Sequence, residues 1–215
     1  MQQFSDLADC DLLASMSKFD WSDVERIHQE LQPFLSELAL RKSLLRAMLR
    51  KSREDAKTAD LSELLPDMYK YTLHVDPVSK ARIRLHLFRP ESTLPHSHRW
   101  VLASHILSGV VTGKYYGIVS ELGAHGVTLS PLLIKTMGTG SFYVMADTTV
   151  HWFESTPGSS SLVVRGPASR NMSKQFWPDS IRDKYGAEAN QEQSAVMSQT
   201  DFEDGIRQLE SLGVL

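Results

Sequence analysis

Three histidines are the residues of this 215-residue chain that are best suited to chemistry. The segment 95–109, PHSHRWVLASHILSG, contains His96 and His98 separated by a single serine. Alternate side chains of a β-strand project from the same face, so an extended segment would hold the two imidazoles side by side. Neutral imidazole is a suitable ligand for divalent transition metals. Taken alone, the pair is better explained by chance or by two surface histidines, so the metal interpretation depends on a third ligand.

The third histidine, His151, lies in the apolar and aromatic segment GSFYVMADTTVHWFES, residues 140–155. A core histidine with one backbone partner would also account for it. The spacing of these residues, however, resembles that of the two motifs of the cupin superfamily over roughly residues 80–167. The positions at the intervals of the first motif are Pro90, His96, His98, Leu102 and Gly109. Those at the intervals of the second motif are Gly140, Ala146, Thr148, His151 and Ser155.

The resemblance implies a small jelly-roll barrel with a metal ion deep in its mouth, held by His96, His98 and His151. Many cupins place a carboxylate ligand where this chain has Leu102, so three neutral imidazoles would remain, with open positions for substrate, water or dioxygen. The site is then distantly similar to that of the thiol dioxygenases, which use ferrous iron. Those enzymes have Ser-x-His-x-Tyr on a later strand, where this chain has Ser161, Val163 and Arg165. We therefore do not predict cysteine oxidation.

Three functions follow from this resemblance. The first is a non-haem Fe(II) oxygenase or dioxygenase that uses dioxygen on a small anionic molecule such as an amino acid derivative. The second is a redox-silent isomerase, lyase or hydrolase, in which Zn, Mn, Ni or Fe acts as a Lewis acid. Against the second stands the lack of an obvious carboxylate base beside the histidines. The third is a small-molecule binding or sensing protein without turnover.

Several polar residues are candidates for substrate contacts. Arg165 ends an apolar strand on the face of Ser161, and both are predicted to bind substrate, the arginine through a carboxylate. Tyr143 is predicted to donate a proton or hydrogen bond near the metal. In ARIRLHLFRP, Arg84 and His86 alternate with aliphatic residues. The pattern slightly favours a charged face in solvent; in the alternative, Arg84 binds the substrate carboxylate and His86 lines the barrel mouth.

The parity of the next strand bears on a further histidine. If His96 and His98 face inward without a bulge, Ser104 also faces inward and His105 outward. His105 is then a packed or surface histidine rather than a fourth ligand, although a bulge would reverse this.

The elements that position these residues change in type near residue 69. Before it, apolar residues recur at helical intervals over 22–54, with a predicted capping box at Ser22–Glu25 and a predicted break or kink at Pro33. After it, short β-branched and aromatic segments alternate with turn residues, which indicates a mainly β fold, an antiparallel sandwich or barrel. A second predicted capping box, Thr200–Glu203, precedes a short C-terminal helix. We expect a helical extension (1–68), a cupin barrel (69–170) and a C-terminal segment packed on it (171–215).

The composition of the chain bears on which classes of partner it can have. The formal net charge is −3 and the basic residues form no long block, which argues against a nucleic-acid partner. No window is apolar enough to cross a bilayer, and the first twenty residues lack the order of a signal peptide. With a single cysteine, Cys10, these features favour a cytoplasmic protein without a membrane partner. We expect a homodimer, because sheet edges and amphipathic helices can pair across a twofold axis.

Overall fold

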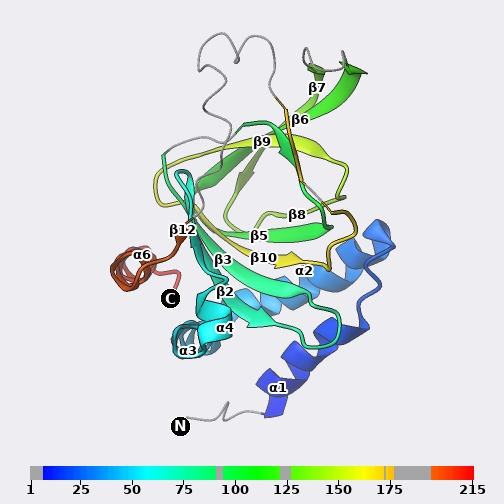
Figure 1. Ribbon diagram of the computed structural model, residues 1–215. Helices are drawn as coiled ribbons and strands as arrows, with labels where there is room; N and C mark the ends of the chain where they lie inside the picture. Colours follow the sequence, from blue (N-terminus) through cyan, green and yellow to red (C-terminus); the bar gives the residue numbers. More distant parts are fainter. Residues whose placement is uncertain (1–6, 91–93, 122–126, 172, 177–194) are drawn as a thin grey trace.

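Two antiparallel sheets face each other and helices cover the outer side of one of them (Figure 1). The computed structural model describes residues 7–90, 94–121, 127–171, 173–176 and 195–215. The first sheet has the strand order β12-β1-β2-β3-β10-β5-β8 and the second has the order β11-β4-β9-β6-β7. The predicted mainly β, jelly-roll type of fold is confirmed by this arrangement.

The strands are short except in one hairpin. The first sheet contains β1 (Glu63–Leu64), β2 (Met68–Val75), β3 (Arg82–Phe88), β5 (Leu102–Ser108), β8 (Phe142–Met145), β10 (Ser160–Arg165) and β12 (Ala195–Val196). The second contains β4 (His96–Ser97), β6 (Val110–Glu121), β7 (Val127–Gly138), β9 (Val150–Ser155) and β11 (Lys174–Gln175).

Two glycines that match the cupin spacing occupy turns that require them. Gly109 connects β5 to β6 with φ +73°, and Gly140 precedes β8 with φ +83°. These angles lie in the left-handed region, which glycine adopts without steric cost. At Gly109 a Cβ atom would also lie 2.3 Å from the Ser159 hydroxyl oxygen, so the turn has no room for a side chain.

The helices are α1 (Leu7–Ala14), the 3-10 turn η1 (Ser15–Lys18), α2 (Val24–Leu40), α3 (Lys42–Glu54), α4 (Ala56–Ala59) and α6 (Gln199–Ser211). The predicted break at Pro33 is wrong, since α2 continues through it and the chain turns at Arg41 instead. The residues beside the proline, including Leu31 and Leu35, are fully buried. Their packing offsets the backbone hydrogen bond that a proline removes.

Both predicted capping boxes start at the wrong residue. Asp23 caps α2 by accepting a hydrogen bond from the Arg26 amide at 3.0 Å, while the Ser22 hydroxyl donates to Asp20. At the other end of the chain Ser198 caps α6, accepting from the Asp201 amide at 3.2 Å. In each case a different polar side chain, no more than two residues away, accepts the hydrogen bond from the backbone at the helix start.

The first sheet is buried on both faces. Its outer face packs against α2 and α3 in a hydrophobic core that includes Ile83, Leu85 and Leu87. Its inner face lines the space between the sheets, where a second apolar cluster includes Phe88, Ile106 and Val163. The favoured solvent-facing position for the charged side of β3 is therefore wrong. The N-terminal helices cover the aliphatic side of β3, so its charged side faces the space between the sheets.

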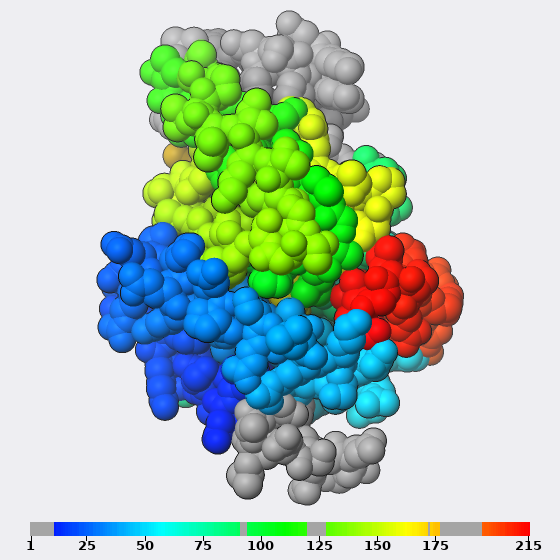
Figure 2. Space-filling view, turned by 180° about the vertical axis from the view of Figure 1, so that it is seen from behind, coloured from blue at the N-terminus to red at the C-terminus, as the bar shows by residue number. Residues whose placement is uncertain are grey.

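Seen from behind, the blue and cyan helices form a band across the lower part of the molecule, with the red C-terminal helix beside it (Figure 2). Helix α6 is joined to this band by an ion pair between Arg53 and Glu203 at 2.7 Å. It also lies against the first sheet, where the buried Tyr71 hydroxyl donates to the Phe202 carbonyl at 3.3 Å. Within the described ranges no helix is long and apolar enough to cross a membrane.

Candidate metal centre and its cavity

The three histidines that match the cupin spacing lie together in the structure. His96 on β4 is the direct antiparallel partner of His151 on β9, and His98 follows β4 by one residue. The ring centroids are 4.5 Å apart for His96–His151, 4.8 Å for His96–His98 and 4.9 Å for His98–His151. One nitrogen from each ring lies within 4.8 Å of the others. Among the described residues, these three histidines are the set of side chains close enough together to hold a metal ion.

The hydrogen bonds and charge states of these rings fit a metal ion. His96 Nδ1 lies 2.9 Å from the Leu94 carbonyl and His151 Nδ1 lies 3.3 Å from that of Thr149. A ring that donates from Nδ1 to a carbonyl has its lone pair on Nε2, the tautomer that binds a metal. Burial lowers the pKa of His151 to about 3 and, with the neighbouring rings, lowers the pKa of His98 well below 6.5. His98 and His151 are therefore neutral, as metal ligands must be.

Arg170 joins the two segments that contain the histidines. Its Nη2 donates to the backbone carbonyls of His98 and Asp147, and its Nε lies 3.2 Å from the Asp147 carboxylate. Asp147 belongs to the turn before β9, and it accepts a further hydrogen bond from the Ser169 hydroxyl at 2.6 Å. This arginine thus fixes the His98 backbone to the turn that leads into His151.

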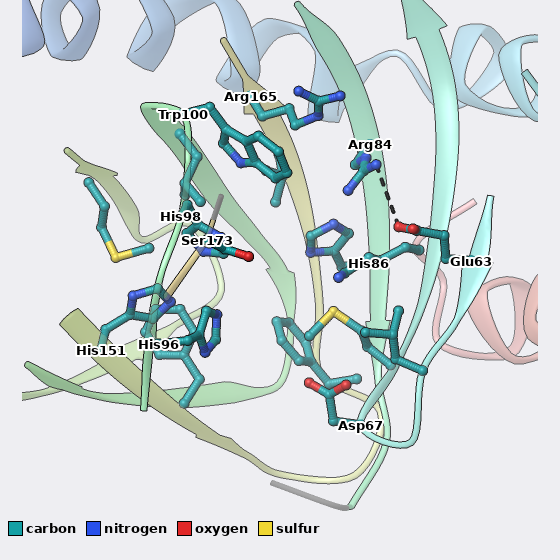
Figure 3. Close-up of a pocket in the computed structure, with 18 of the residues that line it drawn as sticks. Glu63, Asp67, Arg84, His86, His96, His98, Trp100, His151, Arg165 and Ser173 are labelled. Carbon is teal, nitrogen blue, oxygen red and sulfur yellow. Dashed lines mark ion pairs between the residues drawn. The ribbon is translucent and has the colours of Figure 1, made fainter. Parts of the chain in front are cut away.

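The histidines form one side of a cavity of about 240 Å³ between the two sheets (Figure 3). The opposite wall comes from the first sheet, mainly from β3 and β10. Five of the described lining residues are basic and two are acidic. These are Lys70, Arg82, Arg84, Arg99 and Arg165 against Glu63 and Asp67. The cavity therefore has an excess of positive charge.

Two predicted substrate-binding arginines lie in this wall. Arg84 and Arg165 are only 6% and 5% exposed, and the Nε atom of each has no hydrogen-bond partner among the described residues. Glu63 lies 3.6 Å from Arg84. Burial, together with Arg84 and Arg82, lowers the pKa of Arg165 to about 9, and burial lowers that of Arg84 to about 10. Both guanidinium groups remain charged at neutral pH.

The other predicted residues are divided between the cavity and its surroundings. Tyr143 lines the cavity, and burial raises the pKa of its phenol above the ordinary value, so the hydroxyl stays protonated. His86 also lines the cavity but is not part of the histidine group. Ser161, paired with His86 across the strands, is completely buried and is not one of the described lining residues. His105 is neither a lining residue nor a member of the group.

Sequence reasoning missed four residues that the structure brings to the site. Trp100 lies between the two sides of the cavity, while Glu63 and Asp67 line it from β1 and from the turn before β2. Arg170 acts from outside the cavity. Glu63, Asp67 and Arg170 belong to no strand pattern that the sequence shows. The one available signal was for Trp100, which continues the alternation of His96 and His98 in the form His-x-His-x-Trp.

Comparisons with known proteins find no relative in sequence and only distant likenesses in structure. No family model and no curated protein matches the chain. The solved structure of KdgF from Halomonas sp. is 16% identical, with a TM-score of 0.35 over 49% of this chain and 83% of that one. Oxalate decarboxylase from Bacillus subtilis is 14% identical, with a TM-score of 0.40 over 58% of this chain and 34% of that one. The DMSP lyase DddQ from Ruegeria pomeroyi DSS-3 is 12% identical, with a TM-score of 0.39 over 53% of each chain.

The fold is a cupin-type jelly roll. The paired sheets and the strand positions of the three histidines establish this independently of those low similarity scores. Substrate, metal identity, oligomeric state and compartment stay predictions.

Proposed function

We propose that this protein is a metal-dependent cupin enzyme, most simply a non-haem Fe(II) oxygenase acting on a small anionic molecule such as an amino acid derivative. The observation that supports this is a group of three histidines on one side of a positively charged cavity. A metal ion bound there would supply open coordination positions for the substrate and dioxygen.

The chain's own residues have distinct roles in this proposal. His96, His98 and His151 hold the ion, and the backbone carbonyls of residues 94 and 149 keep two of these rings in the ligating tautomer. The protonated phenol of Tyr143 donates a hydrogen bond within the cavity. Its ring also lies 5.7 Å from that of Phe153, which in turn lies 4.8 Å from the His151 ring.

Charge balance supports an anionic substrate. Three imidazole ligands contribute no negative charge, so they leave the charge of a divalent ion uncompensated. The lining residues add further positive charge rather than removing it. Leaving such charges buried and unpaired is unfavourable, and a bound anion would relieve this.

The position of Asp67 favours a second candidate, the redox-silent lyase, isomerase or hydrolase. This carboxylate lines the cavity and is 6% exposed. In that candidate Asp67 would serve as the general base, although it lies across the cavity from the histidines.

Metal analysis and oxygen uptake separate the two candidates. Protein purified without oxygen is analysed for metals beside His96→Ala and His151→Ala, with His105→Ala as the control. Near-stoichiometric iron, lost in the first two variants only, together with substrate-dependent oxygen consumption, is the expected result. Zinc or manganese without oxygen consumption would favour the second candidate. A protein that binds no metal after reconstitution would overturn both.

A further inference from the structure

At the end of the cavity away from the histidines, the basic side chains outnumber the acidic ones. Arg82, Arg84 and Arg165 meet there, and each has an Nε atom without a hydrogen-bond partner in the part of the chain that the structure describes. Arg82 and Arg165 are direct partners across β3 and β10. Arg84 and Val163 are also direct partners, two residues further along the same strands. Glu63, at 3.6 Å from Arg84, is the nearby carboxylate.

A buried guanidinium group normally pairs with a carboxylate or a phosphate, because its planar fork donates two parallel hydrogen bonds to two oxygen atoms. Here Arg84 and Arg165 are almost completely buried, yet a single carboxylate, itself one third exposed, faces them. Mutual repulsion opposes holding the two groups together in the empty cavity. The arrangement therefore resembles a preformed site for an anionic group of a ligand.

One aromatic ring separates this arginine site from the histidines. The Arg165 guanidinium carbon lies 4.2 Å from the centre of the Trp100 ring. The His98 ring stacks on the same indole at 14°, with centroids 5.9 Å apart. Figure 3 shows Trp100 between Arg165 and His98, with Arg84 and Glu63 on the far side from His96 and His151. The arginine site and the histidines are thus neighbours on either side of one indole ring, within the same cavity.

We infer that the cavity binds a small dianion, with one carboxylate on Arg84 and Arg165 and a second acidic group at the metal held by the three histidines. This inference rests on the proposed function for the metal end only. It narrows the substrate class from an anionic molecule to a short dicarboxylate or an amino acid with an acidic side chain. A cavity of about 240 Å³ admits a molecule of this size.

Glu63 has a specific role in this arrangement. Its carboxylate occupies Arg84 in the ligand-free cavity, so an incoming carboxylate has to compete with it. Replacing Glu63 by glutamine removes the competitor and should strengthen binding of the dianion. A residue with a purely structural role would not change affinity in this direction.

The experiment compares two probes of equal chain length, succinate and butyrate, on the full-length metal-loaded protein. Isothermal titration calorimetry is done without oxygen, at low salt and without phosphate. Succinate is expected to bind at least about tenfold more tightly than butyrate, as charge-assisted hydrogen bonds from guanidinium groups imply. Arg165→Gln and Arg84→Gln should each reduce this ratio to below about threefold, and Glu63→Gln should increase succinate affinity. Arg26→Gln, on the exposed side of α2, should change neither.

Equal affinities for the two probes, or a preference that survives both arginine substitutions, would overturn the inference. Circular dichroism checks that each variant folds. If Arg84→Gln does not fold, Arg165→Lys, which keeps the charge but loses the fork, must show a smaller preference for succinate than the wild type. Repeating the titrations on metal-free protein tests the two ideas separately. An arginine-dependent affinity for succinate that metal addition does not change would overturn the inferred contact with the metal, whereas a protein that takes up no metal would overturn the proposed function and leave the arginine site standing.

Discussion

His96 and His151 face each other as direct cross-strand partners of β4 and β9, with their ring centroids 4.5 Å apart. Each ring also meets the carbonyl of the residue two positions before it, at 2.9 Å for His96 and 3.3 Å for His151. The same local geometry is thus repeated on two strands. Strand pairing, rather than a flexible loop, sets the separation of these two candidate ligands.

Removal of either histidine should abolish metal binding. His96→Ala and His151→Ala each leave two imidazoles, and we expect metal affinity to fall by at least about 100-fold, beyond the loss typical of substituting a residue that only orients a ligand. A competition titration with a chromophoric chelator measures this. The control His105→Ala, on β5 outside the histidine group, should bind metal as the wild type does. Full metal occupancy in His151→Ala would contradict the assignment.

Arg170 should act as a positioning residue for the same site. Its hydrogen bonds to the carbonyls of His98 and Asp147 hold both ligand segments, so Arg170→Gln is expected to weaken metal binding by about 10- to 100-fold. The chelator titration is paired with a thermal unfolding curve of the metal-free protein. A variant that lost stability without losing metal affinity would show that the contacts serve the fold alone. Arg26→Gln, on the exposed side of α2, is the control.

The stability of the metal-free protein should fall as the pH is lowered below about 6.5. Burial, followed by Lys70 and Arg84, lowers the pKa of His86 well below 6.5, so the folded state keeps this ring neutral while the unfolded chain takes up a proton. Folding stability is thus lost from pH 6.5 down towards the lowered pKa, by at most about 1.4 kcal/mol per pH unit for each such histidine. Urea unfolding at pH 7, 6 and 5 gives the slope. His86→Gln should make it shallower, and an unchanged slope would refute this explanation.

Gly205 should tolerate no side chain, although it lies inside helix α6. Alanine usually stabilises a helix by about 1 kcal/mol relative to glycine. Here an added Cβ would lie 1.8 Å from the hydroxyl oxygen of Tyr71, a completely buried side chain. We expect Gly205→Ala to lower the free energy of unfolding by roughly 1–3 kcal/mol.

Tyr71→Phe tests the cause of that loss. It removes the hydroxyl, so the double variant should recover most of the stability that Gly205→Ala loses, as a double-mutant cycle by urea unfolding would show. Additive effects of the two substitutions would mean that the clash is not the cause.

The strand region could be predicted from the sequence because two-residue alternation and turn residues survive in each segment. The same alternation made Arg165 a candidate for binding the substrate carboxylate and Arg84 an alternative candidate, and it predicted that His105 would point away from His96 and His98. Spacing then related His151 to the earlier pair. These inferences needed only the local period and the motif intervals.

What the sequence could not reveal depends on contacts between distant segments. The charged side of β3 faces the cavity because α2 and α3 cover the other side, and nothing in the strand itself shows which face a helix will cover. Glu63 lies on the two-residue strand β1, and Trp100 and Arg170 lie outside the strands, so none of the three belongs to a segment long enough to show a period. The helix starts at Asp23 and Ser198 were missed because several nearby residues could all cap a helix, and only the folded backbone selects one.

The charge of the cavity also has a kinetic consequence. The whole chain has a formal net charge of −3, whereas the described residues that line the cavity have an excess of positive charge. A small anion is therefore attracted more strongly at the cavity than by the chain as a whole, which guides its approach. At physiological ionic strength such attraction is screened beyond about 8 Å. Added salt should therefore slow the association of an anionic ligand much more than it changes the rate at which the ligand leaves.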